Sequence, residues 1–296
     1  KPDSPGKPHP PGKPNSPGKP DNPGKPGNPN HPDNPGQPAN VCANTVQNGS
    51  EQSPWLIFTT ADLGLLHDHP DDWFVLCADL ALSGHWSSVA TFSGTLDGNN
   101  HTIANLSNSY GFFKTIEQTG VVKNLKLVNA SISNLSYASA GGVAVTNYGI
   151  IEHVEFSGHV GSRGPVGGIA GTNFGIIRDS KIQGSVSGDG GIGGIAGGNG
   201  GQISNVRVDA AINGALDVGS IAGSNSGTIQ QALAYGTVTS HYGYAGGITG
   251  KNSGTISDST SYSTVYYTNY MFAGPVYGTN TGTVTNSYGY GQVLPK

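Results

Sequence analysis

Histidine and aspartate crowd into one short segment of the chain, Leu66–Asp72, with the sequence LHDHPDD. Imidazole nitrogens and carboxylate oxygens are the ligands that zinc and calcium take in proteins. The candidate ligands here are His67, His69, Asp71 and Asp72. A His-x-His pair beside a Pro-Asp loop is, however, also typical of a solvated loop without a metal. We therefore expect no cofactor and no metal site, and keep these four residues only as weak candidates.

Polar residues that could do acid–base chemistry recur at one position of an internal repeat. That position holds His153, Asp179, Asn205, Gln231, Asp258 and Asn286. Glycosidases and lyases need carboxylates or bases close together. If each repeat forms one coil of a stacked structure, Asp179 and Asp258 lie three coils apart, about 14 Å at ~4.8 Å per coil. This spacing favours turn polarity over catalysis, and we expect a protein that is not an enzyme.

The chain contains only two cysteines, Cys42 and Cys77. In a chain with the character of an exported protein, such a pair favours a disulfide over a redox site. A bond between them would fasten the first folded strand to the body that follows. The alternative is a pair of free, buried thiols.

Tyrosine is concentrated toward the C-terminus, since ten of the 13 tyrosines fall at or after Tyr235. A tyrosine offers a flat apolar face with a polar tip, which suits sugar stacking and protein interfaces. The alternative is that these residues fill space that valine and glycine fill in earlier repeats. The candidates for binding or association are Tyr242, Tyr244, Tyr262, Tyr266, Tyr267, Tyr270, Tyr288 and Tyr290.

The elements that would position these residues belong to a repeat of 26 to 28 residues. Each copy carries one asparagine, with a glycine two positions later and aliphatic residues four before, four after and thirteen after it. The asparagines are Asn147, Asn173, Asn199, Asn225, Asn252 and Asn280. A repeat of this length must be interpreted before any single motif.

The composition of each copy favours strands over helices. Gly, Ser, Thr, Asn, Val and Ile dominate, and three strand-like pieces are separated by Gly/Asn turns. One inward aliphatic per piece gives three hydrophobic ladders when copies stack, which predicts an all-β, right-handed parallel β-helix of about seven coils. The six asparagines then stack as well, and we expect a structural ladder of amide hydrogen bonds.

The copies resemble the GLUG motif of bacterial surface and secreted proteins of the adhesin-like, filamentous-haemagglutinin-like type. The matching pattern is G-G-[IV]-A-G-x-N-x-G-x-I, and it is best preserved in Gly167–Ile177 and Gly193–Ile203. The copy at Gly274–Val284 departs from the pattern, with Pro275 and Tyr277 in its first strand. The resemblance implies a surface-exposed or secreted solenoid with an adhesive or stalk-like role.

Three segments are expected. Residues 1–39 repeat Pro, Gly and Lys with almost no apolar residue, which predicts an extended polyproline II or disordered spacer. The alternative is a recognition arm for peptidoglycan or a partner domain. Residues 40–110 are expected to form an N-terminal cap and the initial strands of the β-helix, with a short helix around Ala61–Leu66. Residues 111–296 are expected to form the coils, the first with Gln118 in the asparagine position.

Charge and hydropathy argue against a nucleic-acid-binding protein and a membrane-spanning protein. The formal net charge is −4, only 11% of residues are charged, and the coils lack a Lys/Arg cluster, so we expect no nucleic-acid partner. No apolar run has the ~20 residues of a membrane span. We expect a secreted or cell-surface protein of a bacterium, a stalk or adhesive module for a glycan or protein. The alternatives are a carbohydrate-active β-helix enzyme and a filament subunit that self-associates through its C-terminal coils.

Overall fold

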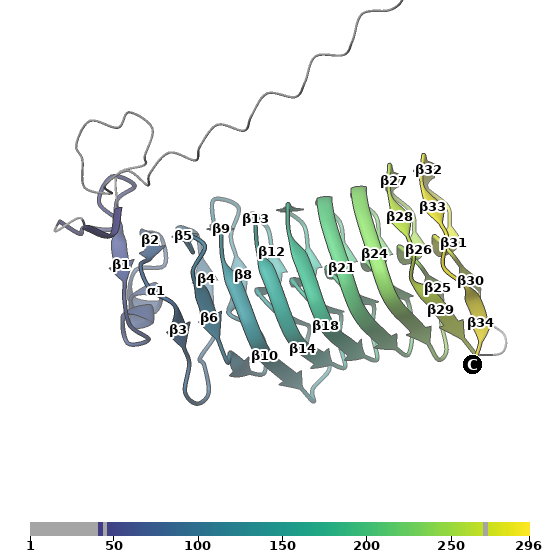
Figure 1. Ribbon diagram of the computed structural model, residues 1–296, viewed down its shortest axis with the longest axis horizontal. Helices are drawn as coiled ribbons and strands as arrows, with labels where there is room; N and C mark the ends of the chain where they lie inside the picture. The colour runs from purple at the N-terminus through teal and green to yellow at the C-terminus, as the bar shows by residue number, and fades with distance from the viewer. Residues whose placement is uncertain (1–40, 44–45, 269–271) are drawn as a thin grey trace, which may run out of the picture. The chain divides into compact units, whose positions relative to one another are not determined.

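The protein is described here from a computed structural model, which covers residues 41–43, 46–268 and 272–296. Residues 1–39, the predicted spacer, and Tyr270 lie outside these ranges. The described part is almost entirely β-structure and forms a parallel β-solenoid of about eight coils (Figure 1). The predicted parallel β-helix is therefore confirmed, with one coil more than expected.

Three parallel sheets run along the solenoid. The eight-stranded sheet consists of β4 (Val89–Phe92), β8 (Phe113–Ile116), β12 (Ala144–Asn147), β16 (Ala170–Asn173), β20 (Ala196–Asn199), β23 (Ala222–Asn225), β26 (Thr249–Asn252) and β31 (Tyr277–Asn280). The six-stranded sheet consists of β11 (Ala140–Gly141), β15 (Val166–Gly167), β19 (Ile192–Gly193), β22 (Val218–Gly219), β25 (Ala245–Gly246) and β30 (Ala273–Gly274).

The third sheet has 20 strands and carries most of the outer surface discussed below. Its first row is β1 (Trp55–Ile57), β2 (Trp73–Leu76), β5 (Thr95–Asp97), β9 (Val121–Lys123), β13 (Ile150–Glu152), β17 (Ile176–Arg178), β21 (Gln202–Gly214), β24 (Thr228–Ser240), β27 (Thr255–Ser257) and β32 (Thr283–Thr285). Its second row is β3 (Leu80–Ala81), β6 (Thr102–Ala104), β7 (Ser107–Asn108), β10 (Lys126–Asn134), β14 (Glu155–Ser162), β18 (Lys181–Gly188), β28 (Thr260–Ser261), β29 (Thr264–Tyr267), β33 (Tyr288–Gly289) and β34 (Val293–Pro295). The 13-residue strands β21 and β24 run through both rows.

The N-terminal region contains three helical elements and the first strands of the solenoid. The helical elements are η1 (Val41–Ala43), η2 (Asp62–Gly64) and α1 (Leu65–Asp68), and the last two lie at the N-terminal end of the stacked coils (Figure 1). Strands β1, β2 and β5 already pair in parallel within the large sheet. The strands of the predicted cap are therefore part of the β-helix, and the extra coil contains β4, which has no asparagine to mark it.

The predicted aliphatic ladders line the interior. The aliphatic residues four before, four after and thirteen after each asparagine are at most 1% exposed in the five coils marked by Asn147 to Asn252. The corresponding residues of the last described coil, Val276, Val284 and Val293, are only partly buried. Burial of these ladders supplies the main stabilisation of the stack, because no single coil can cover its own apolar face.

In a second interior row, the side chains become smaller toward the C-terminus. Successive residues in register are Phe156, Ile182, Val208, Ala234, Ser261 and Gly289. Across the core, glycines make room for the larger members. A Cβ added at Gly142 would lie 2.4 Å from the Phe156 ring, and one at Gly194 would lie 2.7 Å from Val208. The core is thus filled by large side chains in the middle coils and by small ones near the C-terminus.

The six asparagines form a continuous buried ladder. Each Nδ2 donates a hydrogen bond to Oδ1 of the next asparagine, at 2.7–2.8 Å for all five pairs. Most Nδ2 groups also lie 3.2–3.4 Å from backbone carbonyls of their own and the next coil. Within the described residues, Oδ1 of Asn147 has no hydrogen-bond partner, because Ile116 pairs with Asn147 in the preceding coil. The expectation that Gln118 takes this position was wrong, since two extra residues separate Ile116 from Gly120.

Candidate functional site

A row of residues in left-handed backbone conformation marks the corner between the two rows of the large sheet. His153, Asp179, Asn205, Gln231, Asp258 and Asn286 all have φ between 45° and 52°. These are the six residues of the repeat position that raised the possibility of acid–base chemistry. Asparagine and aspartate tolerate this conformation better than most side chains. Their polarity is therefore accounted for by the left-handed backbone conformation of the corner.

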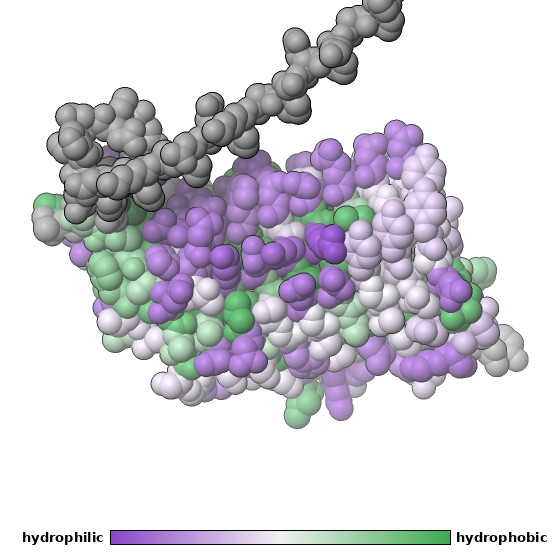
Figure 2. All heavy atoms as spheres, viewed as in Figure 1, coloured by the Kyte–Doolittle hydropathy of each residue, from purple (hydrophilic) through white to green (hydrophobic). Residues whose placement is uncertain are grey.

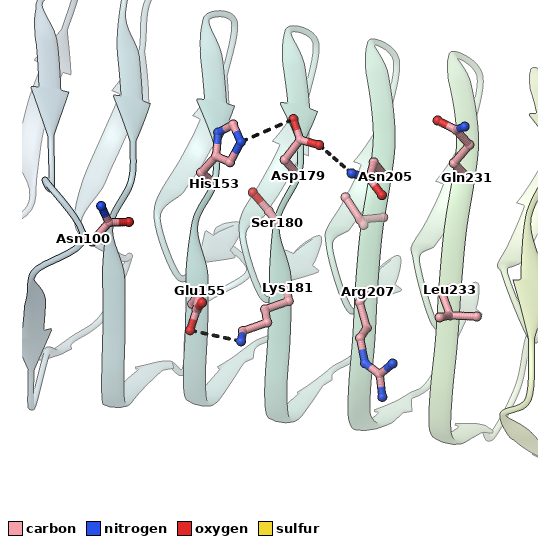
Figure 3. Close-up of a pocket in the computed structure, with 11 residues that line it drawn as sticks. Asn100, His153, Glu155, Asp179, Ser180, Lys181, Asn205, Arg207, Gln231 and Leu233 are labelled. Carbon is pink, nitrogen blue, oxygen red and sulfur yellow. Dashed lines mark hydrogen bonds and ion pairs between the residues drawn. The ribbon is translucent and has the colours of Figure 1, made fainter. Parts of the chain in front are cut away.

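An open trough lies beside this corner in the middle coils (Figure 3). Its volume is about 670 Å³. One row of its lining consists of His153, Asp179, Asn205 and Gln231, and the other of Glu155, Lys181, Arg207 and Leu233. Ser180, Val206 and Asn100 complete the lining. We call this feature the trough.

Short contacts between neighbouring coils order the side chains of the trough. Asn205 Nδ2 donates to Asp179 Oδ1 at 2.6 Å, and His153 Nε2 lies 3.9 Å from Asp179 Oδ2. Lys181 Nζ pairs with a Glu155 carboxylate oxygen at 3.1 Å. His153 is 58% exposed and Asp179 30% exposed, so the trough is open to solvent.

Charges in the large sheet follow the register between coils. Asp97, Lys123, Glu152 and Arg178 occupy successive positions of one row and alternate in sign. Lys126, Glu155, Lys181 and Arg207 occupy successive positions of the row that enters the trough. Like charges placed directly opposite each other destabilise neighbouring strands. The second row breaks the alternation at its last step, where Lys181 and Arg207 are adjacent.

The trough contains serine, histidine and aspartate, but not in an arrangement for nucleophilic catalysis. Ser180 is 3% exposed, and its hydroxyl donates to the Arg178 carbonyl at 2.7 Å. The same hydroxyl accepts the Val154 backbone N–H at 3.1 Å. Both hydrogen-bonding functions of Ser180 are thus engaged in joining two coils. The His153–Asp179 contact is too long for the hydrogen bond that would orient a catalytic base.

The four weak metal candidates contact tryptophan and serine side chains, and of these four only His69 and Asp72 lie close together, with Nδ1 and Oδ2 3.7 Å apart. His69 stacks on Trp55 with ring centroids 5.1 Å apart, and His67 lies against Trp86 at 5.5 Å. Asp72 accepts the Trp55 indole N–H at 2.9 Å, and Asp71 accepts a hydrogen bond from Ser93. Within the described ranges, no group of three or more His, Cys, Asp or Glu residues is arranged to hold a metal. The structure does not bring these four candidates together as ligands.

Cys42 and Cys77 form a disulfide bond. Their Cα atoms are 5.6 Å apart, and 35 positions separate them in the sequence. The bond connects η1 to the residue that follows β2. It therefore fastens the start of the described chain to the first coils.

The C-terminal tyrosines divide into separate groups. Tyr235, Tyr262 and Tyr290 form a stack on the outer surface, with centroids 5.2 and 5.4 Å apart and ring planes within 24° of parallel. We call these three residues the tyrosine stack. The Arg207 guanidinium carbon lies 4.4 Å from the Tyr235 centroid and covers its other face. Both faces of Tyr235 and Tyr262 are therefore occupied, so sugar stacking on these faces, one of the predicted roles, is not available.

The remaining tyrosines lie elsewhere. Tyr288 flanks Tyr290 at 6.3 Å, and Tyr244 stacks on Phe272 at the corner after β24. Tyr242 is 81% exposed, while Tyr266 and Tyr267 are half-buried at the end of β29. The predicted group is thus not one continuous surface.

Two carboxyl groups outside the trough have shifted pKa values. Burial raises the pKa of Asp217, against the opposing effects of Lys251 and a backbone hydrogen bond from Tyr244. The pKa of Asp79 is lowered, first by a hydrogen bond from the Thr102 backbone N–H and then by one from His101. Both groups serve local structure, at a corner loop and beside β3.

Sequence reasoning identified one side of the trough and missed the other. The left-handed row was visible as a column of polar residues six positions after each asparagine. Glu155, Lys181 and Arg207 were missed because their signal lies in a comparison between repeats. A column drawn eight positions after each asparagine contains all three.

Comparisons with known proteins give a fold and a partial relative. No family model matches the chain. The chain is 31% identical over 137 residues to halomucin of Haloquadratum walsbyi, a match that covers 38% of this chain and 2% of halomucin. A crystal structure of a putative immunoglobulin A1 protease from Bacteroides ovatus is similar with a TM-score of 0.61 and 23% identity, covering 84% of this chain and 79% of that one. The structural likeness establishes the solenoid fold alone.

The described chain also lacks a membrane-spanning helix. Within the ranges that the structure covers, no helix is both long and apolar enough to cross a bilayer. Its longest helix, α1, has four residues.

Proposed function

We propose that the protein is an exported, non-enzymatic surface module that binds a glycan along the trough. The observation that carries this proposal is a trough lined on both sides mainly by polar side chains, exposed or partly exposed, at successive coils. The inner ladders already account for stability, whereas the trough side chains extend into solvent. A site that repeats from coil to coil fits a polymer that lies along the solenoid axis.

Three observations support an exported role. The disulfide is typical of oxidising compartments. The repeats resemble GLUG-type surface and secreted proteins, and we propose that they are of this type. The partial likeness to halomucin also fits an extracellular location, on a cell surface or secreted.

The enzyme alternative rests on the fold and on one neighbour described as a putative protease. Against it stand the engaged hydroxyl of Ser180 and the 3.9 Å separation of His153 and Asp179. We therefore assign the trough to ligand binding without catalysis, with its polar groups recognising the ligand.

A variant that fills the trough tests the proposal. Lys181→Trp places a bulky side chain in the lining, while Gln183→Trp places the same side chain two residues further along β18, outside it. On an array of capsular, plant cell-wall and animal glycosaminoglycan oligosaccharides, we expect Lys181→Trp to lose binding and Gln183→Trp to keep it. Equal binding by both variants would contradict the assignment. Release of new sugar ends from a bound polysaccharide would instead support the enzyme alternative.

A second role, self-association through the last coils, is favoured by a separate observation. A hollow of about 430 Å³ lies among Ala273–Gly278, Val284 and Ser287, where the apolar ladders are only partly covered. We propose that this end docks against another copy. Sedimentation over a wide concentration range should show association that a Val276→Lys, Val284→Lys double variant loses while its circular dichroism stays that of the parent. A parent that remains monomeric at high concentration would contradict this role.

A further inference from the structure

We propose that the trough selects a negatively charged linear polysaccharide and that Arg207 binds its anionic groups. This inference rests on the proposed glycan-binding function and specifies the class of glycan. Arg207 projects from the exposed face of β21, at the rim of the trough (Figure 3).

Arg207 is the one arginine of the described residues that has no carboxylate within ion-pair distance. The other two arginines of the described chain have acidic neighbours, since Arg163 lies 3.8 Å from Asp189 and Arg178 lies 2.5 Å from Glu152. No carboxylate of the described residues lies within ion-pair distance of Arg207.

The position of Arg207 in the sheet makes this lack of a partner informative. The row through Asp97 and Arg178 alternates in sign at every step, whereas the row in the trough places Arg207 directly beside Lys181. Lys181 turns to Glu155, so its charge is already compensated. One negative charge is thus missing from the pattern at this coil, and an anionic group of a ligand supplies it.

The guanidinium is held in a geometry that leaves its donors free. The Arg207 guanidinium carbon lies over the Tyr235 ring, which in turn stacks on Tyr262, so the tyrosine stack holds the guanidinium in place. The N–H groups lie in the guanidinium plane and remain available at its edge. A planar edge with several donors binds a carboxylate in bidentate fashion and also suits a sulfate. Hydroxyl groups of the same polymer would meet the polar side chains of Asn205 and Gln231 across the trough.

Spacing favours a polysaccharide over a peptide as the occupant. Corresponding side chains of successive coils are separated by the distance between parallel strands, ~4.8 Å, whereas an extended peptide advances only ~3.3 Å per residue. A sugar ring is longer than an amino-acid residue and comes closer to one ring per coil. Figure 2 shows hydrophilic side chains gathered over the middle coils, where the trough lies, and paler residues over the coils of β24, β28 and β33.

Calorimetric titration of the full chain tests this proposal with matched probes. The probes are a hexamer of galacturonic acid, its uncharged methyl ester, and a sulfated galactan hexamer. We expect the charged hexamers to bind and the methyl ester to bind roughly tenfold or more weakly, with an affinity for the charged probes that falls as salt rises. Preference for the sulfated or the carboxylated hexamer shows whether Arg207 binds a sulfate or a carboxylate group.

Three variants isolate the residue. Arg207→Gln should lose roughly tenfold or more in affinity for the charged hexamers, and Arg207→Lys should fall between Arg207→Gln and the parent. Arg163→Gln is the matched control, because Arg163 also lies over a tyrosine ring, Tyr137, but outside the trough, and it should bind as the parent does.

Arg207→Glu restores the alternation of charge beside Lys181. It should therefore unfold at the same or a higher temperature than the parent while losing the charged hexamers. Parental affinity in Arg207→Gln and Arg207→Glu would overturn the role of Arg207. If the methyl ester binds as tightly as the charged hexamers, and Lys181→Trp abolishes this binding, the ligand is not selected by its negative charge. The proposed glycan-binding function of the trough would then still stand. Failure of all three hexamers to bind, with neutral glycans retained on the array, would likewise overturn this inference alone.

Discussion

The outer face of the large sheet is built differently in its middle and its C-terminal coils, although the backbone register is the same. In the middle coils, ion pairs such as Glu155–Lys181, at 3.1 Å, connect one coil to the next. In the C-terminal coils, the connection is the tyrosine stack, with ring centroids 5.2 and 5.4 Å apart. Both arrangements follow from one rule, that every side chain faces its counterpart from the neighbouring repeat.

That rule divides side chains into two classes. Neutral groups that can both donate and accept, or that can stack, repeat without change, as the asparagines and tyrosines do. Charged groups cannot repeat in this way and must alternate in sign, because like charges opposite each other repel. A break in the alternation, as at Arg207, is then a departure that calls for a partner outside the sheet.

The interior differs between the same two regions, and the largest expected effect comes from there. Phe156→Ala should lower the free energy of unfolding by about 3–5 kcal/mol, because it leaves a large cavity that glycines across the core cannot fill. Ser261→Ala, in the same interior row, should lose only about 0.5–1.5 kcal/mol, since it removes the one hydrogen bond that the Ser261 hydroxyl accepts from the Ser263 backbone N–H. Urea unfolding of both variants measures the difference, and equal losses would contradict the tapered core.

The N-terminal coils carry a covalent fastening that has no counterpart among the described C-terminal coils. Replacing Cys42 and Cys77 together by alanine should cost roughly 3–4 kcal/mol, from the entropy of a loop with 35 positions between its ends. Hydrogen exchange should then show the first coils opening before the middle ones. If the double variant unfolds at the parental temperature, the disulfide does not contribute to holding the first coils.

The asparagine ladder should be more costly to interrupt in its middle than at its end. Asn199→Ala removes one ladder bond on each side and leaves Asn225 Oδ1 buried without its donor, which should cost about 1–3 kcal/mol. Asn280→Ala removes a single ladder bond in a half-buried coil and should cost less. Neither variant should alter glycan binding, and an unchanged melting temperature for Asn199→Ala would contradict a stabilising ladder.

The two kinds of outer contact should respond differently to salt. Glu155→Gln should cost only about 0.2–1 kcal/mol, and this loss should shrink as salt rises, because both partners are exposed. Tyr262→Leu keeps apolar area but loses two stacked rings, for a cost of about 1 kcal/mol that salt should not change. Melting temperatures at low and high salt separate the two, and a salt-dependent effect of Tyr262→Leu would contradict the distinction.

The smallest effect is expected from the Pro/Gly/Lys-rich segment. A chain that begins at Asn40 should unfold at the same temperature as the full chain, because residues 1–39 have too few apolar side chains to contribute to a core. Differential scanning calorimetry of both chains makes the comparison. A large destabilisation would mean that the segment packs against the solenoid.

The repeat was enough to predict the fold, because a residue type that recurs in phase must recur in space once coils stack. It placed the asparagines and the three aliphatic ladders correctly. It missed the coil of β4, where no asparagine marks the turn, and it misplaced Gln118, because an insertion of two residues changes the local phase. Binding residues were harder to find, since a trough depends on contrasts between neighbouring repeats, whereas a repeat pattern records only what neighbours share.

The asparagine ladder has a consequence for how such a molecule changes its length. All of its amides point the same way, each presenting an N–H to the next coil and an acceptor to the previous one. An in-frame duplication or deletion of one whole repeat between Asn147 and Asn225 would therefore rejoin donor to acceptor without loss. The ladder itself would then continue across the junction while the solenoid lengthened or shortened by ~4.8 Å, so any cost of such a change would come from the tapered core and the alternating charges.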